Sequence, residues 1–457
     1  MTHSFEEVMD RGETGPIMSE HKFDLLVGSL SKKLTKEFRV KMNPEEIVTS
    51  DDGLVDAAFE ASMQLFLDLG VYCLNTSRVM KFSEAELREA LKATPPTVTF
   101  GEGKEQASMV PRRVEDRTPP FVASSAVGTP VPSSLYVKVV QSYAQEPILD
   151  SISGPSLLEL SGRKVRSGTP LEVEAAIYNI RAMKEAAKLA GRPGLSGHNF
   201  VACAEKTAAI FAAMRPEFGV RPTDGLLVAA LGEMKVDYER LNKVPFLQET
   251  GYHIGALYGP LMGGYAGGPA ETAIINLAHH FLGLLVYRAQ WHDNFPLNIL
   301  KTINTTPEML WLISIVSQAL SRNTDIIKAN SPFCAAGPCT EMIAWELAAH
   351  SIAATVSGSD LNPAAPCRNK YPERCSGMEA RIHAEVGHAV ARAGLRRSEA
   401  NSMVKLLLRK YQGHVDDAPL GKKFSECYDL ETLKPSQEYL TIEEKLMADL
   451  ERMGLTF

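Results

Sequence analysis

From about residue 120 onward, short apolar runs alternate with longer stretches whose apolar residues recur at helical spacing. This alternation is typical of βαβ units, which place parallel strands in one sheet and helices on its faces. Eight runs are candidate strands, at residues 121–125, 148–153, 196–201, 225–231, 253–258, 296–303, 324–329 and 356–361. Eight units favour an α/β fold of the (β/α)8 TIM-barrel type, although a doubly wound open sheet produces the same alternation.

One helix of the alternating region is marked at both ends. Thr169, Pro170 and Glu172 combine an N-cap, a proline at the first helical position and a capping-box glutamate. Gly191 supplies the C-terminal stop. We expect the apolar stripe between them to lie against the barrel wall.

Helical stretches flank the alternating region on both sides. Before it, residues 20–36, 52–70 and 83–93 have helical periodicity, and residues 97–100 and 107–110 flank a glycine-containing turn that predicts a hairpin. After it, helices follow residue 376, and a last helix is predicted over residues 442–453, capped by Thr441 and ended at Gly454. We therefore expect three parts: a helical extension with a hairpin over residues 1–118, the barrel over 119–400, and a C-terminal helical extension over 401–457.

Composition indicates a compact globular protein and excludes several partners. Of 457 residues, 45% are apolar and 23% are charged, and the net charge of -7 comes without any basic run of the nucleic-acid-binding kind. The start lacks the basic and apolar regions of a secretory signal, so we expect a cytoplasmic protein. The most apolar stretch, residues 273–287, is interrupted by Asn276 and two histidines and is shorter than the roughly 20 residues that span a bilayer. We expect a buried helix there, and no membrane partner.

Polar residues near the ends of the candidate strands are the first place to look for chemistry, because a barrel has its active site at the C-terminal ends of its strands. His198 and Asn199 lie beside one strand, after a turn through glycine and proline. The imidazole can donate or accept a hydrogen bond or bind a metal. The alternative is a structural histidine, hydrogen-bonded beside the sheet.

Three other segments carry unusual residues. The glycine-rich loop at 263–269 precedes a helix and suits an anion, but its spacing matches neither nucleotide-binding pattern, and tight packing explains it equally well. The segment at 330–342 follows a strand and carries Cys334 and Cys339. The cluster WHDNFP at 291–296 precedes a predicted strand, which places it on the bottom face and indicates a structural role.

A zinc site is an alternative use of the seven cysteines. Four cysteines and two histidines form the candidate set: Cys334, Cys339, Cys367, Cys375, His383 and His388. Their wide, irregular spacings match no standard ligand pattern, so we predict no metal. The odd number of cysteines in a chain without an export signal predicts thiols rather than disulfides.

Five motifs in a shared order resemble one family of enzymes: AGRPG at 190–194, GGYAGG at 263–268, AGPCTEM at 336–342, SGMEAR at 376–381 and FSECYD at 424–429. Together they are similar to the archaeal monomethylamine:corrinoid protein methyltransferases, from about residue 50 to the C-terminus. The resemblance implies a (β/α)8 barrel, assembly into homo-oligomers, and methyl transfer to the Co(I) of a partner corrinoid protein. It implies no cofactor bound by this chain.

The resemblance also assigns a position to His198, where the family carries pyrrolysine. The pyrroline ring is an electrophile to which an amine adds, and an imidazole offers no such carbon. The family's residues around that ring are changed as well: a carboxylate aligns with Leu257, an amide with Ser331 and a phenol with Phe333. We therefore expect a substrate other than monomethylamine.

A quaternary ammonium or sulfonium compound is the expected methyl donor, because its leaving group is already activated. In this hypothesis Phe333 and Tyr258 face the cation through their rings, and His198, Asn199, Ser331 and Asn330 orient the remainder. His198 as a cationic general acid is a second version, for a less activated donor. Two rival functions remain: a non-catalytic barrel that binds a methylated solute, and a zinc-assisted methyltransferase.

Overall fold

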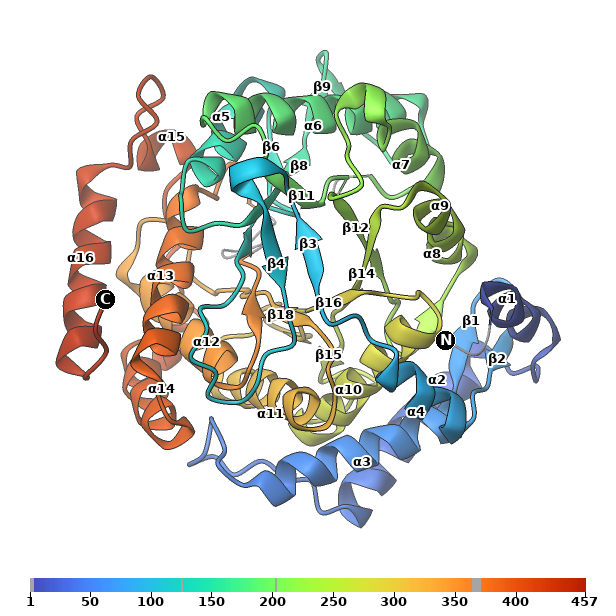
Figure 1. Cartoon of the computed structure of the whole chain (residues 1–457). Coiled ribbons are helices and arrows are strands. Elements are labelled where there is room, and N and C mark those ends of the chain that lie inside the picture. Colours follow the sequence, from blue (N-terminus) through green and yellow to red (C-terminus); the bar gives the residue numbers. More distant parts are fainter. Residues whose placement is uncertain (1–3, 125, 202–203, 364–370) are drawn as a thin grey trace.

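Eight parallel strands form a closed ring around an apolar interior (Figure 1). The computed structural model describes residues 4–124, 126–201, 204–363 and 371–457 of the chain. Within these residues the ring consists of β5 (Ala123–Ser124), β7 (Ser151–Ser153), β11 (Ser196–Asn199), β12 (Gly225–Ala229), β14 (His253–Tyr258), β16 (Trp291–Asn294), β18 (Lys328–Asn330) and β19 (Asp360–Leu361). With helices outside every part of the ring, this is a (β/α)8 barrel, as the sequence predicts.

The hydrogen-bond ladder of the barrel is interrupted at one place. The strands pair in two sheets, β11-β7-β5 and β12-β14-β16-β18-β19, and a bridge between Val122 and Leu361 joins them on one side. On the other side, β11 and β12 lie together without a regular ladder. The Phe200 backbone N–H donates to the Gly225 carbonyl at 3.4 Å, and the Leu227 N–H donates to the Asn199 side-chain oxygen at 3.3 Å. We call this junction of β11 and β12 the seam.

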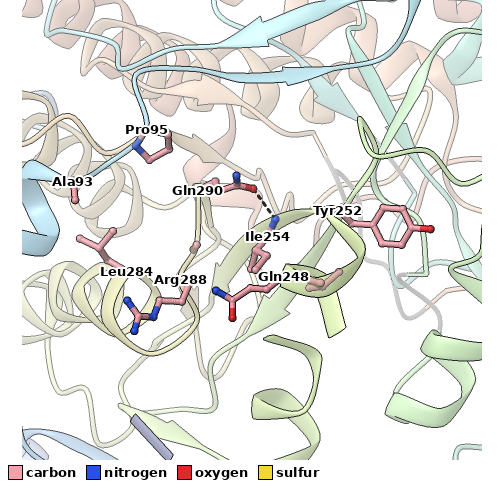
Figure 2. A pocket seen from close by; sticks show the side chains of 11 residues that line it. Ala93, Pro95, Gln248, Tyr252, Ile254, Leu284, Arg288 and Gln290 are labelled. Carbon is pink, nitrogen blue, oxygen red and sulfur yellow. Dashed lines mark hydrogen bonds between the residues drawn. The ribbon is translucent and has the colours of Figure 1, made fainter. Parts of the chain in front are cut away.

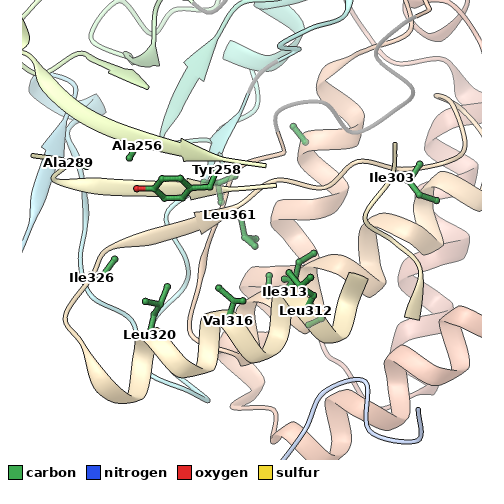
Figure 3. Packing of buried hydrophobic residues seen from close by; sticks show 14 of the residues in the cluster. Ala256, Tyr258, Ala289, Ile303, Leu312, Ile313, Val316, Leu320, Ile326 and Leu361 are labelled. Carbon is green, nitrogen blue, oxygen red and sulfur yellow. The ribbon is translucent and has the colours of Figure 1, made fainter. Parts of the chain in front are cut away.

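The outer layer consists of helices that follow the strands. Three of them begin with a proline at the first helical position, where no backbone N–H is needed. The helices are α5 (Ser133–Ala144), α6 (Pro170–Leu189), α7 (Thr207–Ala213), α8 (Tyr238–Leu241), α9 (Lys243–Thr250), α10 (Pro269–Leu285), α11 (Pro307–Asn323), α12 (Glu341–Val356) and α13 (Gly377–Ala393). Figure 3 shows Val316 and Leu320 of α11 packed toward the strands that carry Ala256 and Tyr258.

The N-terminal extension covers one side of the barrel and closes its bottom. It comprises α1 (Phe5–Thr14), α2 (Glu20–Glu37), α3 (Asp52–Leu69), β1 (Val71–Cys73), β2 (Arg78–Met80), α4 (Glu84–Lys92), β3 (Val98–Phe100) and β4 (Ala107–Met109). Phe281 of α10 is met edge-on by Phe59 and Phe66 of α3, so α10 is buried between the barrel and the extension. The predicted buried helix is confirmed, and none of the described helices is both long and apolar enough to cross a membrane.

The predicted hairpin, β3 and β4, lies across the N-terminal end of the barrel (Figure 1). Phe100 contacts the rings of Phe121 and Trp291, at centroid distances of 5.6 and 5.9 Å. Nε2 of His253 lies 2.8 Å from the Thr99 carbonyl oxygen. The hairpin and four of the barrel strands, with the residues that lead into them, thus share one apolar cluster inside the barrel: Val98, Phe100, Met109, Phe121, Ala123, Leu227, Trp291, Ile327 and Ala329.

The C-terminal part of the chain, after the last barrel strand, is helical. Its helices are α13, α14 (Arg397–Tyr411), α15 (Phe424–Cys427) and α16 (Gln437–Arg452). α16 begins after Ser436, whose side chain caps it, so the predicted cap at Thr441 is wrong. Thr441 instead bonds to the Gln437 carbonyl inside the helix. The boundary expected at residue 400 falls inside α14.

Two of the predicted strands are misplaced. The strand predicted over 296–303 lies earlier, at β16, and only β17 (Leu297–Asn298) of that segment pairs, with β15 (Leu261–Met262). The strand predicted over 356–361 is reduced to β19, because α12 continues to Val356. Of the first predicted strand, Ser125 lies outside the described residues.

Candidate functional site

Side chains along each barrel strand alternate between the interior and the helices outside. Leu227 and Ala329 belong to the interior cluster, and Leu257 packs against it. The strand register places Asp293 directly between Leu257 and Ala329. These residues therefore share the interior face, toward the C-terminal ends of the strands.

His198 faces the same interior and is 1% exposed. Its ring meets the Trp291 ring edge-on at a centroid distance of 5.9 Å, and its Nδ1 lies 3.2 Å from the Ser151 hydroxyl. Burial lowers the pKa of the imidazole to about 3, and a hydrogen bond with the Ile152 backbone opposes this only in part. His198 is therefore a neutral imidazole at neutral pH.

Asn199 holds the seam. Its side-chain oxygen accepts from the Leu227 N–H, where a regular ladder would supply a backbone carbonyl. Its own carbonyl accepts from the Ser153 hydroxyl at 2.6 Å. The side chain also lines a cavity of about 250 Å³ that Leu257 lines from the neighbouring side. Asn199 thus joins β11 to β12 through its side chain and also lies at the rim of the barrel interior.

Asp293 is a functional candidate that the sequence reasoning missed. Both carboxylate oxygens accept from the Ser331 hydroxyl at 3.0 Å, and one also accepts from the Asn362 amide at 2.8 Å. Burial raises the pKa of the Asp293 carboxyl to about 7, while these hydrogen bonds oppose the rise. The position was assigned to the bottom face because the strand was predicted too late in the chain. A carboxylate and an amide just before the Phe295-Pro296 turn are the signal of a polar strand end.

Ser331 and Phe333 follow β18 at the barrel mouth. The Ser331 hydroxyl donates to Asp293, which places it at the interior, and its role in orienting the donor stays a prediction. Phe333 is half-buried and stacks on Phe295, with ring centroids 5.4 Å apart and an interplanar angle of 24°. Asn304 fixes this loop, since its side-chain oxygen accepts from the Phe333 N–H at 2.7 Å. The geometry thus brings together His198, Leu257, Asp293 and Ser331, with Phe333 at the rim.

Two residues expected in the pocket lie behind the sheet instead. Tyr258 points toward α10, where its hydroxyl lies 2.8 Å from Nδ1 of His292 and its ring stacks near His279. Asn330 donates to the hydroxyls of Ser317 and Ser359, at 2.9 and 2.7 Å. In the alternation along their strands both side chains point outward, so neither faces a ligand inside the barrel. The prediction that Tyr258 and Asn330 contact the methyl donor is therefore wrong.

The two loops with unusual sequences are explained by packing. In the glycine-rich loop, the N–H groups of Gly263, Gly264 and Gly267 bond to carbonyls of the same loop, so they do not face an anion. In the loop after β18, the N–H groups of Ala335 and Ala336 donate to the buried carboxylate of Glu346, at 2.7 and 2.9 Å. Glu346 therefore fastens this loop to α12.

The candidate zinc ligands do not converge. Among the described residues, no group of three or more His, Cys, Asp or Glu side chains is placed to hold a metal ion. His383 bonds to His350 at 2.9 Å, and His388 lies 3.0 Å from the Pro120 carbonyl oxygen. The thiols of Cys339 and Cys427 are reduced and share a hydrogen bond, and Cys367 lies outside the described residues.

A second cavity, of about 350 Å³, lies near the N-terminal end of β14, away from the residues just described (Figure 2). Arg288 and Gln248 line it, and Gln290 accepts from the Ile254 N–H at 3.0 Å. Because barrel enzymes carry their chemistry at the C-terminal ends of the strands, we place the candidate site in the interior at the other end.

Comparisons with known proteins identify the family. The family described as monomethylamine methyltransferase MtmB matches residues 4–455. The chain belongs to this family. Curated members include MtmB1 of Methanosarcina barkeri, 31% identical over 98% of this chain and 97% of its own length, and MtmB of Methanosarcina mazei, 30% identical over the same shares.

Solved structures of the family agree with the fold. The crystal structure of Methanosarcina barkeri MtmB matches with a TM-score of 0.94 at 29% identity, and that of a hydroxylamine complex of MtmB matches with 0.95 at 30% identity. Both cover 100% of each chain. The predicted barrel and the predicted membership of a methyltransferase family are therefore confirmed.

Proposed function

We propose that this chain transfers a methyl group from a small onium compound, a quaternary ammonium or a sulfonium, to the cobalt of a partner corrinoid protein. The observation that carries the proposal is the neutral, buried His198 in the barrel interior. It supplies neither an electrophile for an amine nor a charged acid for a poor leaving group. A donor that needs neither is one whose methyl group is already on a cationic centre.

Asp293 supports a cationic donor. Its carboxylate lies in the interior beside Leu257, and its hydrogen-bond donors are all neutral. The oxygen of the Asn362 side chain, which is also buried there, has no hydrogen-bond partner among the described residues. A buried carboxylate without a cationic partner is stabilised when a cation binds. Phe333, at the rim, can add a ring face worth about 0.5–2 kcal/mol.

The general-acid version of the mechanism is not supported by the protonation state of His198. An acid with a pKa of about 3 carries its proton in only a minute fraction of molecules at neutral pH. In our proposal His198 is a positioning residue that fills the interior against Trp291. The reduced corrinoid of the partner supplies the nucleophile, and this chain binds and orients the donor. Homo-oligomer formation also remains a proposal.

The test mixes the purified chain with a reduced corrinoid protein and a panel of methylated ammonium, sulfonium and amine compounds, and follows methylation by the cobalt absorbance. We expect turnover with at least one onium compound and none with monomethylamine. Turnover with none of the onium compounds would refute the proposal. Binding of an onium compound without turnover would instead favour a solute-binding barrel.

Asp293→Asn tests the counter-charge. Loss of the carboxylate should raise the KM for a cationic donor by on the order of tenfold or more. In the unsubstituted chain, affinity should fall as pH drops below about 7, because the carboxyl is then protonated, and the variant should lose this dependence. Asp325→Asn is the matched control, since that carboxylate is 58% exposed. Equal pH dependence in all three proteins would contradict the role of Asp293.

A further inference from the structure

The cavity of about 250 Å³ at the seam has a charged wall. Besides Asn199 and Leu257, its lining includes Lys243, Arg240 and Glu205. Lys243 is the first residue of α9. The cavity therefore joins the candidate site at Leu257 to a lysine outside the barrel ring.

Lys243 is mostly buried and has no polar partner in the described part of the chain. The residue is 8% exposed, and its ammonium makes no hydrogen bond or ion pair with any described residue. The other two buried lysines are satisfied: Lys235 pairs with Asp24 and Glu20, and Lys328 donates to Ser321 and to the Gly358 carbonyl. The stem of Lys243 is thus buried, and its ammonium is left to face the cavity.

The ammonium of Lys243 keeps its charge in this setting. Lys243 follows Asn242, a residue of helical conformation that ends α8 and begins α9. Burial lowers the pKa of the ammonium to about 8, so it stays mostly charged at neutral pH. A charged group that faces a cavity, and that has no partner among the described residues, fits a ligand-binding role better than a structural one.

The carboxylates near Lys243 are mostly engaged elsewhere. Glu239 accepts from the N–H and the hydroxyl of Thr207, at 3.0 and 2.8 Å. Asp237 caps α8 and pairs with Arg240 at 2.7 Å. Glu205 lines the cavity but is solvent-exposed. Since Arg240 is paired with Asp237, the ammonium of Lys243 is the cation of the cavity wall that has no partner among the described residues.

We propose that Lys243 binds an anionic group of the methyl donor, so that the donor is a zwitterion with a methylated onium centre at one end and a carboxylate at the other. This inference rests on the proposed function. The inference is supported by the positions of the charged residues along the site. Lys243 and Leu257 line one cavity, and Leu257 lies beside the Asp293 carboxylate in the strand register. A positive and a negative residue therefore flank Leu257. The cavity lies below the range of about 300–1,000 Å³ for drug-sized ligands, which fits a compound of a few carbon atoms.

The test compares two probes, trimethylglycine and tetramethylammonium, which differ in the carboxylate. Binding is measured by calorimetry on the full chain, without the corrinoid protein. We expect trimethylglycine, or a homologue with one to three more methylene groups, to bind at least about tenfold more tightly than tetramethylammonium. Lys243→Met should abolish this preference and leave tetramethylammonium binding unchanged, whereas Lys243→Arg should keep it.

The variants carry their own controls. Lys243→Met removes a charge that has no partner among the described residues, so the variant should fold, and its thermal unfolding midpoint should be no lower than that of the unsubstituted chain. Lys188→Met, at an exposed lysine of α6, should behave as the unsubstituted chain. Equal affinity for carboxylated and plain onium compounds, or a preference that survives Lys243→Met, would overturn the inference.

Methyl-transfer assays separate this inference from the proposed function. Turnover of a carboxylated onium compound with the same kcat/KM in Lys243→Met as in the unsubstituted chain would overturn the anion site and leave the proposed function standing. A lysine-dependent preference in binding, with no methyl transfer from any compound, would support the anion site and refute the proposed function.

Discussion

Replacing His198 with asparagine should change how stability depends on pH. The folded-state pKa of about 3 lies below the ordinary value of 6.5, so the unfolded chain takes up a proton between these values and the folded chain does not. The stability that comes from the neutral ring is therefore fully present above about pH 6.5 and is lost as pH falls through this window. His198→Asn keeps an amide near the position of Nδ1 and does not titrate.

The magnitude follows from the unfolded-state protonation alone. Between pH 7.5 and 5.5, one such histidine lowers the free energy of unfolding by about 1.4 kcal/mol. The pH-dependent loss in His198→Asn should thus be smaller than in the unsubstituted chain by about 1.4 kcal/mol. Any constant cost of the smaller side chain beside Trp291 cancels in this difference.

The assay is reversible urea unfolding at fixed protein concentration at the two pH values. His21→Asn, at an exposed histidine of α2, should show the same pH dependence as the unsubstituted chain. If His198→Asn loses as much stability on acidification as the unsubstituted chain, the ring is protonated in the folded state, and the argument against general-acid catalysis fails with it.

Three further substitutions test the contacts that shape the barrel. Asn199→Ala leaves the buried Leu227 N–H without its acceptor and should lower the free energy of unfolding by about 1–3 kcal/mol, measured in urea. Gly283→Ala places a Cβ 1.6 Å from the Tyr258 hydroxyl oxygen and should cost at least about 1–3 kcal/mol. This cost should be smaller when Tyr258 is also replaced by phenylalanine, and Tyr258→Phe alone should leave methyl transfer unchanged. An unaltered cost, or a loss of activity in Tyr258→Phe, would contradict the position of Tyr258 against α10. Glu346→Gln exchanges one carboxylate oxygen for an amide that faces the Ala335 and Ala336 N–H groups, and should lower the thermal unfolding midpoint; an unchanged midpoint would deny its role in fastening the loop.

The sequence predicts the architecture well because alternation of apolar runs and helix end signals are local properties. Pro170 begins α6 as expected, and the hairpin β3–β4 lies where its turn predicts it. The strand at β16 was missed for a physical reason: three of its four residues, His292, Asp293 and Asn294, are polar, whereas the segment after it is more apolar. Strand ends in a barrel interior carry polar groups for function, so hydropathy fails there first.

The candidate site is less predictable because it depends on which face each residue occupies. Leu257 and Tyr258 are neighbours in the chain, yet one faces the interior and the other α10. A shift of one position in the assumed alternation exchanges the two, and the sequence alone does not fix it. The ionisation of His198 and Asp293 is similarly a product of burial that no motif expresses.

Because the hairpin β3–β4 belongs to the apolar interior of the barrel, it limits how a gene for this protein can be cut and recombined. Its residues precede every barrel strand in the chain, and its apolar side chains cover the base of the barrel interior once the strands have formed. A gene fragment that encodes only the eight strand-helix units would produce a tube open at its base, with Phe121 and Trp291 in water. The hairpin and the barrel therefore form one structural unit. A barrel transferred by recombination into another protein must include the hairpin that covers its N-terminal end.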